Sequence, residues 1–238
     1  MAAIEATSGH GMMKRLFDAL LALCALVAVS PLLLVAAVGI RLTTKGPILY
    51  RARRTGYRGR EFTLYKLRTM RVDASSTAGP ITARNDSRVF PFGAWLRATK
   101  VDELPQLVNV LRGEMAIVGP RPEAPEMVRR YYTTDDLETL QVLPGLTSPG
   151  SLYYYTHCES ALASDDVTRL YAEQLLPRKL AMDRVYIANA TFLYDVRVML
   201  RTIAVIAARG LGRRQFPEPP EMAQIHLRPD APTVRWTP

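Results

Sequence analysis

The longest uninterrupted run of apolar positions lies near the start of the chain. From Ala19 to Ile40 there are 22 residues without a formal charge, and only Asp18 interrupts the run that begins at Leu16. As a straight helix, these 22 residues would extend about 33 Å, enough to cross a hydrocarbon core of about 30 Å. The pattern therefore predicts a helix that enters a membrane.

Two features of this run oppose a simple membrane span. Ser30-Pro31 stands at its centre, and proline removes a helical hydrogen-bond donor and clashes with the carbonyl four residues back. Bases flank the run on both sides, at Lys14, Arg15, Arg41 and Lys45. Because basic flanks prefer the cytoplasm, a segment that breaks at Ser30-Pro31 and returns would keep both flanks there. The Ser30 hydroxyl could then bond a backbone group that the break frees.

The residues alone support a re-entrant helix and a spanning helix equally. A cleaved signal peptide is less consistent, because the run exceeds the usual apolar region of about 7–15 residues and a basic stretch follows it.

Shorter patterns follow downstream. Alternating residues at 48–50 and 62–65 predict two short strands, with a turn at 57–59. Leu104, Leu107, Val108 and Leu111 have the i, i+3, i+4, i+7 spacing of one helix face. Because proline is tolerated only in a first turn, Pro105 places the start of this helix at 101–104, and Gly113 is a natural stop.

The remaining segments complete the predicted organisation. Residues 72–90 and 144–150 are expected to be loops, 123–140 a helix and 171–194 mainly helical, and the apolar stretch at 196–206 would pack in the domain or lie in the lipid interface. The expected fold class is α+β, a mostly helical small globular domain with short strands, interfacial amphipathic helices and an N-terminal membrane segment. The expected parts are a disordered start at 1–12, the membrane segment at 13–45, a cytosolic domain at 46–209 and an irregular proline-rich tail at 210–238.

Composition narrows the class of protein. The chain has 238 residues, a formal charge of +9, 48% hydrophobic residues and 22% charged residues. This apolar content excludes wholesale disorder, and a single long apolar run excludes a multi-span transporter. The two cysteines form no disulfide framework, and the three histidines lack metal-ligand spacing.

Residues 41–71 contain ten bases and one acid, Glu61. They would form an electrostatic anchor on anionic lipid or a surface for a phosphate-bearing substrate. A nucleic-acid surface is the third option, which the membrane segment just upstream opposes.

Two adjacent acids and one arginine further along the chain are candidate catalytic or binding residues. Asp102 and Glu103 fall in the first turn of the predicted helix, where acids are usually caps and less often catalytic. Arg121 stands between Pro120 and Pro122, so its restricted backbone would suit a bidentate phosphate contact, although an ordinary solvated loop arginine has the same surroundings.

These residues resemble the bacterial sugar transferase family, the monotopic polyprenol-phosphate phosphoglycosyl transferases, over about residues 13–209. The likeness rests on an ordered set of motifs. They are Lys14-Arg15-Leu16-Phe17-Asp18, Ser30-Pro31, Tyr65-Lys66-Leu67-Arg68-Thr69-Met70, Asn85-Asp86-Ser87-Arg88, Leu96-Arg97-Ala98-Thr99, Asp102-Glu103-Leu104-Pro105-Gln106-Leu107, Gly113-Glu114-Met115, Gly119-Pro120-Arg121-Pro122 and Pro144-Gly145-Leu146-Thr147.

The resemblance implies a membrane enzyme that moves a sugar-1-phosphate from a UDP-sugar to undecaprenyl phosphate and releases UMP. It implies a re-entrant helix-break-helix at residues 16–40, broken at Ser30-Pro31. Asp102 would be the nucleophile that forms a covalent phosphosugar intermediate, and Glu103, with Asp102, would hold Mg²⁺.

Arg97 would be catalytic together with Asp102 and Glu103, and Arg121 would bind the substrate. Both arginines would neutralise the diphosphate and the departing UMP. The other matching positions assigned to substrate binding are Gly119, Pro120, Lys66, Arg68, Asp183 and Tyr186.

The resemblance also sets the expected setting and partners. The protein would act at the bacterial inner membrane, with its catalytic domain on the cytoplasmic face. Its partners would be the bilayer, the UDP-sugar, undecaprenyl phosphate and downstream glycosyltransferases, with a homodimer also considered and no nucleic acid. The alternative is a non-catalytic membrane-surface scaffold that retains the fold.

Departures from the family pattern leave the sugar and the glycan pathway open. Thr147 is followed by Ser148-Pro149-Gly150-Ser151-Leu152-Tyr153-Tyr154-Tyr155 instead of the frequent Gly-Trp-Ala-Gln-Val-Asn-Gly-Arg run, and Lys100-Val101 replaces the commoner Ser-Leu. The chain also matches the minimal catalytic form, which lacks a multi-span N-terminal extension.

Overall fold

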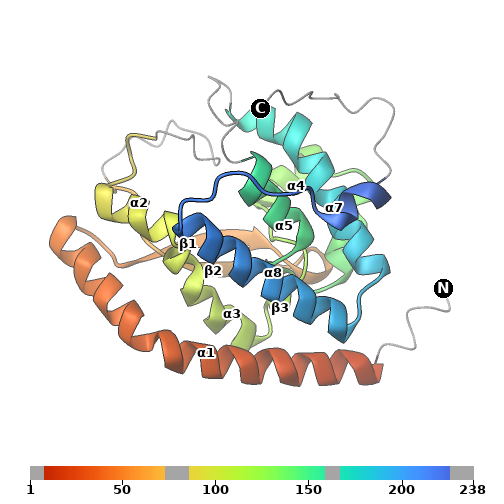
Figure 1. The fold of residues 1–238 in the computed structure, drawn as a ribbon, viewed down its shortest axis with the longest axis horizontal. Coiled ribbons are helices and arrows are strands. Elements are labelled where there is room, and N and C mark those ends of the chain that lie inside the picture. The colour runs from red at the N-terminus through yellow and green to blue at the C-terminus, as the bar shows by residue number, and fades with distance from the viewer. Residues whose placement is uncertain (1–7, 73–85, 159–166, 226–238) are drawn as a thin grey trace.

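The computed structural model describes residues 8–72, 86–158 and 167–225. In Figure 1 a long bent helix runs along one edge of a mostly helical body that holds two very small sheets. The predicted α+β class, mostly helical with short strands, is confirmed. Residues 1–7, most of the predicted 72–90 loop and the end of the tail lie outside the described residues.

Helix α1 (Ser8–Thr43) contains the apolar run and continues through Pro31. The expected interruption at Ser30-Pro31 is therefore not an end of the helix; instead, α1 has two arms that meet at a bend near its middle (Figure 1). Because Pro31 has no N–H, the carbonyl of Val27 cannot accept the usual helical bond, and the Ser30 hydroxyl donates to it at 2.8 Å. The predicted use of Ser30 is thus observed.

Both arms of α1 contact the rest of the chain. In the first arm, Lys14 pairs with Asp195 at 2.5 Å and Arg15 donates to the carbonyl of Val110 at 2.9 Å. In the second arm, Ala36 and Ile40 are buried in a core cluster with Phe90, Leu96 and other residues. Among the described residues, α1 alone is long and apolar enough to cross a membrane, by length and composition.

The predicted hairpin is confirmed. Strands β1 (Leu49–Thr55) and β2 (Glu61–Leu67) pair antiparallel around the short 3₁₀ helix η2 (Tyr57–Gly59), where Arg58 and Gly59 adopt positive φ. Exposed bases alternate with buried residues on β1: Arg51 and Arg53 face solvent, whereas Ala52 is buried. Arg68, just after β2, is buried and donates to the carbonyl of Pro47, which joins the hairpin to the end of α1.

The next segment carries the two candidate acids. Helix α2 (Pro91–Ala98) is followed by the 3₁₀ helix η3 (Val101–Gln106) and helix α3 (Leu107–Arg112). The predicted start and stop of the helix are confirmed, since Gly113 ends α3 in the left-handed conformation. The first turns are 3₁₀ because Pro105 cannot donate within an α-helix.

A small parallel sheet follows. Strand β3 (Ala116–Val118) pairs with β4 (Gly145–Thr147), and between them lie helix α4 (Pro125–Tyr131) and the 3₁₀ helix η4 (Asp136–Gln141). The prediction of one helix over 123–140 is therefore wrong, because α4 ends at Tyr131 and the next residue, Tyr132, has extended backbone. The segment gives no strong stop signal such as glycine at that point.

The C-terminal half is helical. It comprises α5 (Pro149–Tyr153), the π-helix η5 (Tyr154–Cys158), α6 (Val167–Leu170), the π-helix η7 (Tyr171–Leu175), α7 (Leu176–Ala188) and α8 (Phe192–Gly210). In the described part of the predicted tail, the 3₁₀ helix η8 (Pro220–Gln224) is held by Glu221, which binds Arg201 and Tyr194.

Apolar side chains of α8 contact apolar side chains of α1. Phe17 of α1 meets Phe192 of α8 edge to face, with ring centroids 4.9 Å apart. Large apolar side chains remain exposed on both helices, including Leu20, Val27, Val35 and Leu200. A surface of this kind marks a place where protein or lipid is bound.

Candidate active site

Glu103 is the centre of a compact charged cluster. Arg121 donates to both of its carboxylate oxygens, at 2.9 and 2.7 Å, and Lys66 donates to Oε1 at 3.1 Å. These three residues come from η3, the loop after β3 and strand β2, so the fold brings together positions far apart in the sequence. Although burial opposes ionisation, the charges of Arg121 and Lys66 hold the pKa of Glu103 well below its usual range.

Asp102, next to Glu103 in the sequence, differs from it in hydrogen bonding. Its side chain is buried, and its Oδ1 has no hydrogen-bond partner among the described residues. Burial raises the pKa of Asp102, and the neighbouring Glu103 adds to this effect, whereas the charges of Lys66, Lys100 and Arg97 oppose it. A buried polar atom without a partner is costly and requires an explanation. The buried Oε1 of Gln106 and Oδ2 of Asp183 also lack a partner among the described residues, so Asp102 is set apart by the charged cluster beside it.

The loop that carries Arg121 is held rigidly from behind. Gly119 donates to the carbonyl of Thr147 at 3.0 Å, and the carbonyl of Pro120 accepts from Gly145 at 2.8 Å. The backbones of Gly119 and Gly145 approach so closely that a Cβ on Gly145 would lie 2.1 Å from the Gly119 nitrogen. Gly119 and Pro120 therefore fix the shape of the loop that carries Arg121, and the substrate contacts predicted for them stay predictions.

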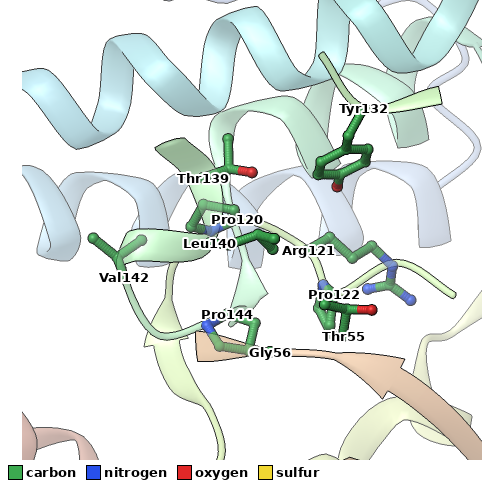
Figure 2. Close-up of a pocket in the computed structure, with 10 residues that line it drawn as sticks. All are labelled: Thr55, Gly56, Pro120, Arg121, Pro122, Tyr132, Thr139, Leu140, Val142 and Pro144. Carbon is green, nitrogen blue, oxygen red and sulfur yellow. The ribbon is translucent and has the colours of Figure 1, made fainter. Parts of the chain in front are cut away.

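Figure 2 shows the small cavity behind this loop. Its volume is about 10 Å³, enough for roughly one water molecule and too small for a substrate. The side chain of Arg121 extends away from Leu140 and Val142 at the other end of the cavity (Figure 2). The guanidinium therefore serves the carboxylate cluster, and the cavity belongs to the packing of the loop.

The other predicted site residues fall into two groups. The charge of Arg97 acts on Asp102, and its guanidinium donates to Thr69 at 3.5 Å, so it lies next to the cluster. Arg68 binds backbone carbonyls near the end of α1. Asp183 is fully buried and accepts from the Gly150 N–H at 3.0 Å. These hydrogen bonds hold the local fold, while Oδ2 of Asp183 has no partner among the described residues, so the substrate contacts predicted for Arg68 and Asp183 stay predictions.

Tyr186 is also held by structural contacts. It is buried, and its hydroxyl donates to the Asp195 carboxylate and to the carbonyl of Val118, which joins α7, α8 and β3. Burial and the nearby Asp195 raise its pKa far above the usual range, so the phenol stays protonated. These two hydrogen bonds of Tyr186 connect elements of the fold, and neither involves a residue of the charged cluster.

The sequence patterns missed a second charged cluster. Glu123 accepts from Lys179 and from the Tyr171 hydroxyl, the latter at 2.6 Å, and all three side chains are buried. Glu123 lies two residues after the proline-bounded arginine, but Lys179 lies 56 residues after Glu123 with no local pattern to connect them. Only the tertiary structure reveals the pair.

The site also fits the magnesium ion that the resemblance implies. Mg²⁺ is usually held by one or two carboxylates together with substrate phosphates. Asp102 offers a free oxygen and Glu103 is its neighbour, although Glu103 must release part of its contact with Lys66 or Arg121 to bind a metal. Among the described residues, no group of three histidine, cysteine or acidic side chains could hold a metal by itself, so substrate oxygens would complete the site.

Comparison with known proteins agrees with this arrangement. The family described as bacterial sugar transferase matches residues 9–209. The chain is 34% identical over 204 residues to "UDP-glucose:undecaprenyl-phosphate glucose-1-phosphate transferase" of Xanthomonas campestris pv. campestris, covering 84% of this chain and 39% of that protein. It is 33% identical over 215 residues to "Exopolysaccharide production protein PSS" of Rhizobium leguminosarum bv. phaseoli, covering 84% of this chain and 98% of that protein.

A third relative has a different sugar in its name. It is "UDP-N-acetylgalactosamine-undecaprenyl-phosphate N-acetylgalactosaminephosphotransferase" of Aeromonas hydrophila, 32% identical over 205 residues, which cover 86% of this chain and 46% of that protein. The chain thus spans less than half the length of several relatives and nearly all of the Rhizobium protein. The family match covers most of the chain, including both acids and the proline-bounded arginine, and the chain therefore belongs to the bacterial sugar transferase family.

Proposed function

We propose that this protein transfers a sugar-1-phosphate from a UDP-sugar to undecaprenyl phosphate and releases UMP. The observation that carries the proposal is the pairing of Asp102, which has a buried carboxylate oxygen without a partner, with the cation-bound Glu103 next to it. A purely structural pair of acids at a helix start would have both carboxylates capped or solvated. The names of the relatives give the same reaction class.

In the proposed first step, an oxygen of Asp102 attacks the phosphorus bonded to the sugar. A carboxylate–phosphorus bond forms, the phosphoanhydride bond breaks, and UMP leaves with the electron pair. In the second step, a phosphate oxygen of undecaprenyl phosphate attacks the same phosphorus and restores the Asp102 carboxylate. A carboxylate is a competent nucleophile in such covalent catalysis, and its buried environment limits the competition from hydrogen-bonding water.

The surrounding residues neutralise charge. The diphosphate donor is anionic and would be repelled by Asp102 and Glu103, so cations must lie close by. Arg121, Lys66 and Arg97 supply these charges from three different elements. When bound, Mg²⁺ would supply Lewis-acid stabilisation of the phosphate oxygens. Glu103 would shift from its present partners toward the metal when the donor binds.

We also propose that α1 is re-entrant and that the charged cluster faces the cytoplasm. Lys14 and Arg15 at one end of α1 contact α8 and α3, and Thr44 after the other end accepts from Arg68. A straight spanning helix would separate its ends by about 30 Å across the bilayer, so both ends could not contact one globular domain on one side. The exposed apolar side chains of α1 and α8 would enter the lipid.

This placement suits the lipid acceptor. A polyprenol chain stays in the bilayer while its phosphate lies at the surface, so the enzyme must present its site close to the interface. The product would then pass to downstream glycosyltransferases of a bacterial glycan pathway at the inner membrane.

The decisive experiment measures UMP release by purified protein with undecaprenyl phosphate, Mg²⁺ and a panel of UDP-sugars. The panel begins with UDP-glucose and UDP-N-acetylgalactosamine, the sugars named for the relatives. Without the acceptor, intact-protein mass should rise by one sugar phosphate. Asp102→Asn should abolish both signals while the protein stays folded, because an amide cannot form the adduct and asparagine is also a good cap.

Asp135→Asn is the matched control, because Asp135 is exposed and distant in sequence from the candidate acids. It should retain UMP release and the adduct. An adduct on Asp102→Asn, or no UMP release by the wild type with any donor, would overturn the proposal and favour a scaffold.

The membrane topology is tested separately by cysteine labelling. Met12→Cys and Lys45→Cys, each in a Cys24→Ala background, should both resist a membrane-impermeant reagent in intact cells and react after lysis. Labelling of either position from outside would overturn the re-entrant topology. Pro31→Leu restores the missing N–H donor for the Val27 carbonyl and should shift molecules toward a spanning helix, with Ser30→Ala as the control that keeps the proline.

A further inference from the structure

Lys100 has an unusual backbone conformation directly before the candidate acids. It lies between α2 and η3 with φ +59° and ψ +14°, in the left-handed region that a non-glycine residue rarely adopts. Its N–H donates to the carbonyl of Arg97 at 3.2 Å, and its own carbonyl accepts from the Glu103 N–H at 3.1 Å. A strained position of this kind persists only where the surroundings fix it, and such positions cluster at functional sites.

The aromatic ring of Tyr155 fixes the side chain of Lys100. The Lys100 ammonium lies 4.0 Å from the ring centroid, and the guanidinium of Arg209 lies at the same distance from the same ring. Tyr155 is itself held, because its hydroxyl donates to the carbonyl of Ala98 at 3.3 Å and its carbonyl accepts from Arg209 at 2.5 Å. A buried ring in this position restricts the ammonium to one region.

Lys100 lies two residues before Asp102, and its carbonyl accepts from the N–H of Glu103. The charge of Lys100 acts on both Asp102 and Glu103, together with that of Lys66. Lys100 and Tyr155 are also two of the points at which the sequence departs from the common family pattern. The structure shows that these separate departures contact each other.

The charge balance at the cluster favours a further anionic ligand. Four cationic side chains act on two anionic ones there: Lys66, Arg97, Lys100 and Arg121 on Asp102 and Glu103. When all six are ionised, these side chains carry a net positive charge, part of which is offset by Asp86, which acts on Arg97, and by Glu123, which acts on Arg121. A diphosphate group is a ligand that would use this excess.

We propose that Lys100 is a further binding residue for the diphosphate of the donor, and that Tyr155 is a positioning residue that holds the Lys100 ammonium beside Asp102 and Glu103. The inference rests on the proposed function for the identity of the donor. It adds a cation that the family pattern does not supply at this position and gives the divergent segment after Thr147 a role at the site.

The test uses binding of UDP, a diphosphate that carries no sugar to transfer, to the full chain in detergent with Mg²⁺. Lys100→Asn removes the charge but tolerates the left-handed backbone, so it should weaken UDP binding about tenfold, as expected for a lost charge-assisted contact. Lys100→Arg keeps the charge and should stay within about threefold of the wild type. UMP, which lacks the second phosphate, should lose less affinity than UDP in Lys100→Asn.

A double-mutant cycle tests the role of Tyr155. Tyr155→Leu should weaken UDP binding about threefold in the wild-type background, within the range of a cation–π contact. It should cause no further loss in the Lys100→Asn background, because the ammonium is then absent. Tyr155→Phe keeps the ring, should bind UDP like the wild type, and replaces Tyr155→Leu as the informative variant if the leucine protein does not fold.

Each outcome decides a separate point. Wild-type UDP affinity in folded Lys100→Asn would overturn the role of Lys100. Equal losses from Tyr155→Leu in both backgrounds, or a loss in Tyr155→Phe, would overturn the positioning role of the ring. UDP binding that depends on Lys100 in a protein that releases no UMP would support this site and would overturn only the proposed transfer reaction.

Discussion

Two charged clusters of the protein differ in how fully their polar atoms are hydrogen-bonded. Each receives one residue from the segment Pro120-Arg121-Pro122-Glu123. Arg121 joins Glu103 and Lys66 in the candidate active site, whereas Glu123 joins Lys179 and Tyr171 in the interior. The Lys179 side chain is 2% exposed and that of Arg121 is 25% exposed. In the interior cluster Glu123 and Lys179 bind each other and both bind the Tyr171 hydroxyl, whereas beside Glu103 the Oδ1 of Asp102 has no partner among the described residues.

The difference teaches that burial of charge does not by itself identify a functional site. A buried ion pair with complete hydrogen bonding holds the structure together, and removing one partner leaves an uncompensated charge. A site for an anionic substrate needs the reverse, namely charges that are partly exposed and an acceptor oxygen that is still free. The four predictions below separate these two roles.

The largest expected effect is on stability, at Glu123. Glu123→Gln keeps the shape of the side chain but leaves the buried Lys179 ammonium without its hydrogen-bonded carboxylate, which should cost about 3–5 kcal/mol of unfolding free energy. Denaturant unfolding in detergent measures this loss. The folded fraction should keep its kcat for UMP release within about threefold.

The double variant Glu123→Gln with Lys179→Met is the control for this experiment. Because it removes both charges, it should recover most of the lost stability. If Glu123→Gln were as stable as the wild type but inactive, Glu123 would belong to the active site and the comparison would fail.

The next effect is on rate, at Arg121. Arg121→Ala should lower kcat/KM for the donor about 30- to 1000-fold, which corresponds to about 2–4 kcal/mol of transition-state stabilisation. Its unfolding free energy should change far less, because Glu103 keeps its contact with Lys66 and its partial exposure. Arg121→Lys keeps the charge but loses the two-pronged contact, so its activity should be intermediate. Unchanged kcat/KM in folded Arg121→Ala would remove this arginine from the site.

The fold was predictable from the sequence wherever a local signal was strong. The 22-residue uncharged run, the hairpin around residues 57–59 and the stop at Gly113 all rest on patterns within a few residues. The helix expected over 123–140 was wrong because the break after Tyr131 carries no glycine or proline; it is marked instead by local hydrogen bonds, in which the Thr133 N–H and hydroxyl donate to the Asp136 carboxylate. A continuous α1 was one of the two alternatives that the sequence left open; the break that the resemblance implies at Ser30-Pro31 is a bend, where the Ser30 hydroxyl donates to the Val27 carbonyl.

The candidate site was predictable in composition and only partly in geometry. Motif resemblance selected Asp102, Glu103, Arg121 and Lys66, which the structure brings together. It also selected Asp183, which is buried, accepts from the Gly150 N–H with one oxygen and keeps the other without a partner among the described residues. A motif records which residues accompany a function and does not separate those that touch substrate from those that hold the scaffold. The partners of Glu123 and of Lys100 come from distant segments and carry no sequence signal.

A smaller effect, on pH dependence, is expected at Asp183. Burial raises its pKa from 3.8 to about 6, against the opposing charge of Lys179 and the hydrogen bond from Gly150. The folded protein therefore binds a proton that the unfolded chain does not bind between about pH 4 and 6. Above pH 6 the ionised Asp183 lowers the unfolding free energy by at most about 3 kcal/mol. This loss of stability disappears as the pH falls toward 4.

Asp183→Asn removes this titration but keeps an oxygen acceptor for the Gly150 N–H. The stability of the variant minus that of the wild type should increase as the pH rises from 4 to 7, and most of the change should fall between pH 4 and 6. Comparing the two proteins cancels the titration of Glu123 and the other shared carboxylates. A difference that stays constant over this range would show that Asp183 has an ordinary pKa.

The smallest effect is expected at Glu126, a third paired carboxylate three residues after Glu123. Glu126 meets Arg130 at 2.7 Å on the surface of α4, where the two side chains are 59% and 67% exposed. Water screens this pair and it lies near the start of the helix, so Glu126→Gln should cost less than about 1 kcal/mol and leave UMP release unchanged. Its distance is similar to that between Arg121 and Glu103, so proximity cannot explain the three different outcomes. A loss at Glu126 as large as that at Glu123 would show that pairing, and not burial, sets the cost. A small loss assigns the cost at Glu123 to desolvation, which the exposed pair lacks.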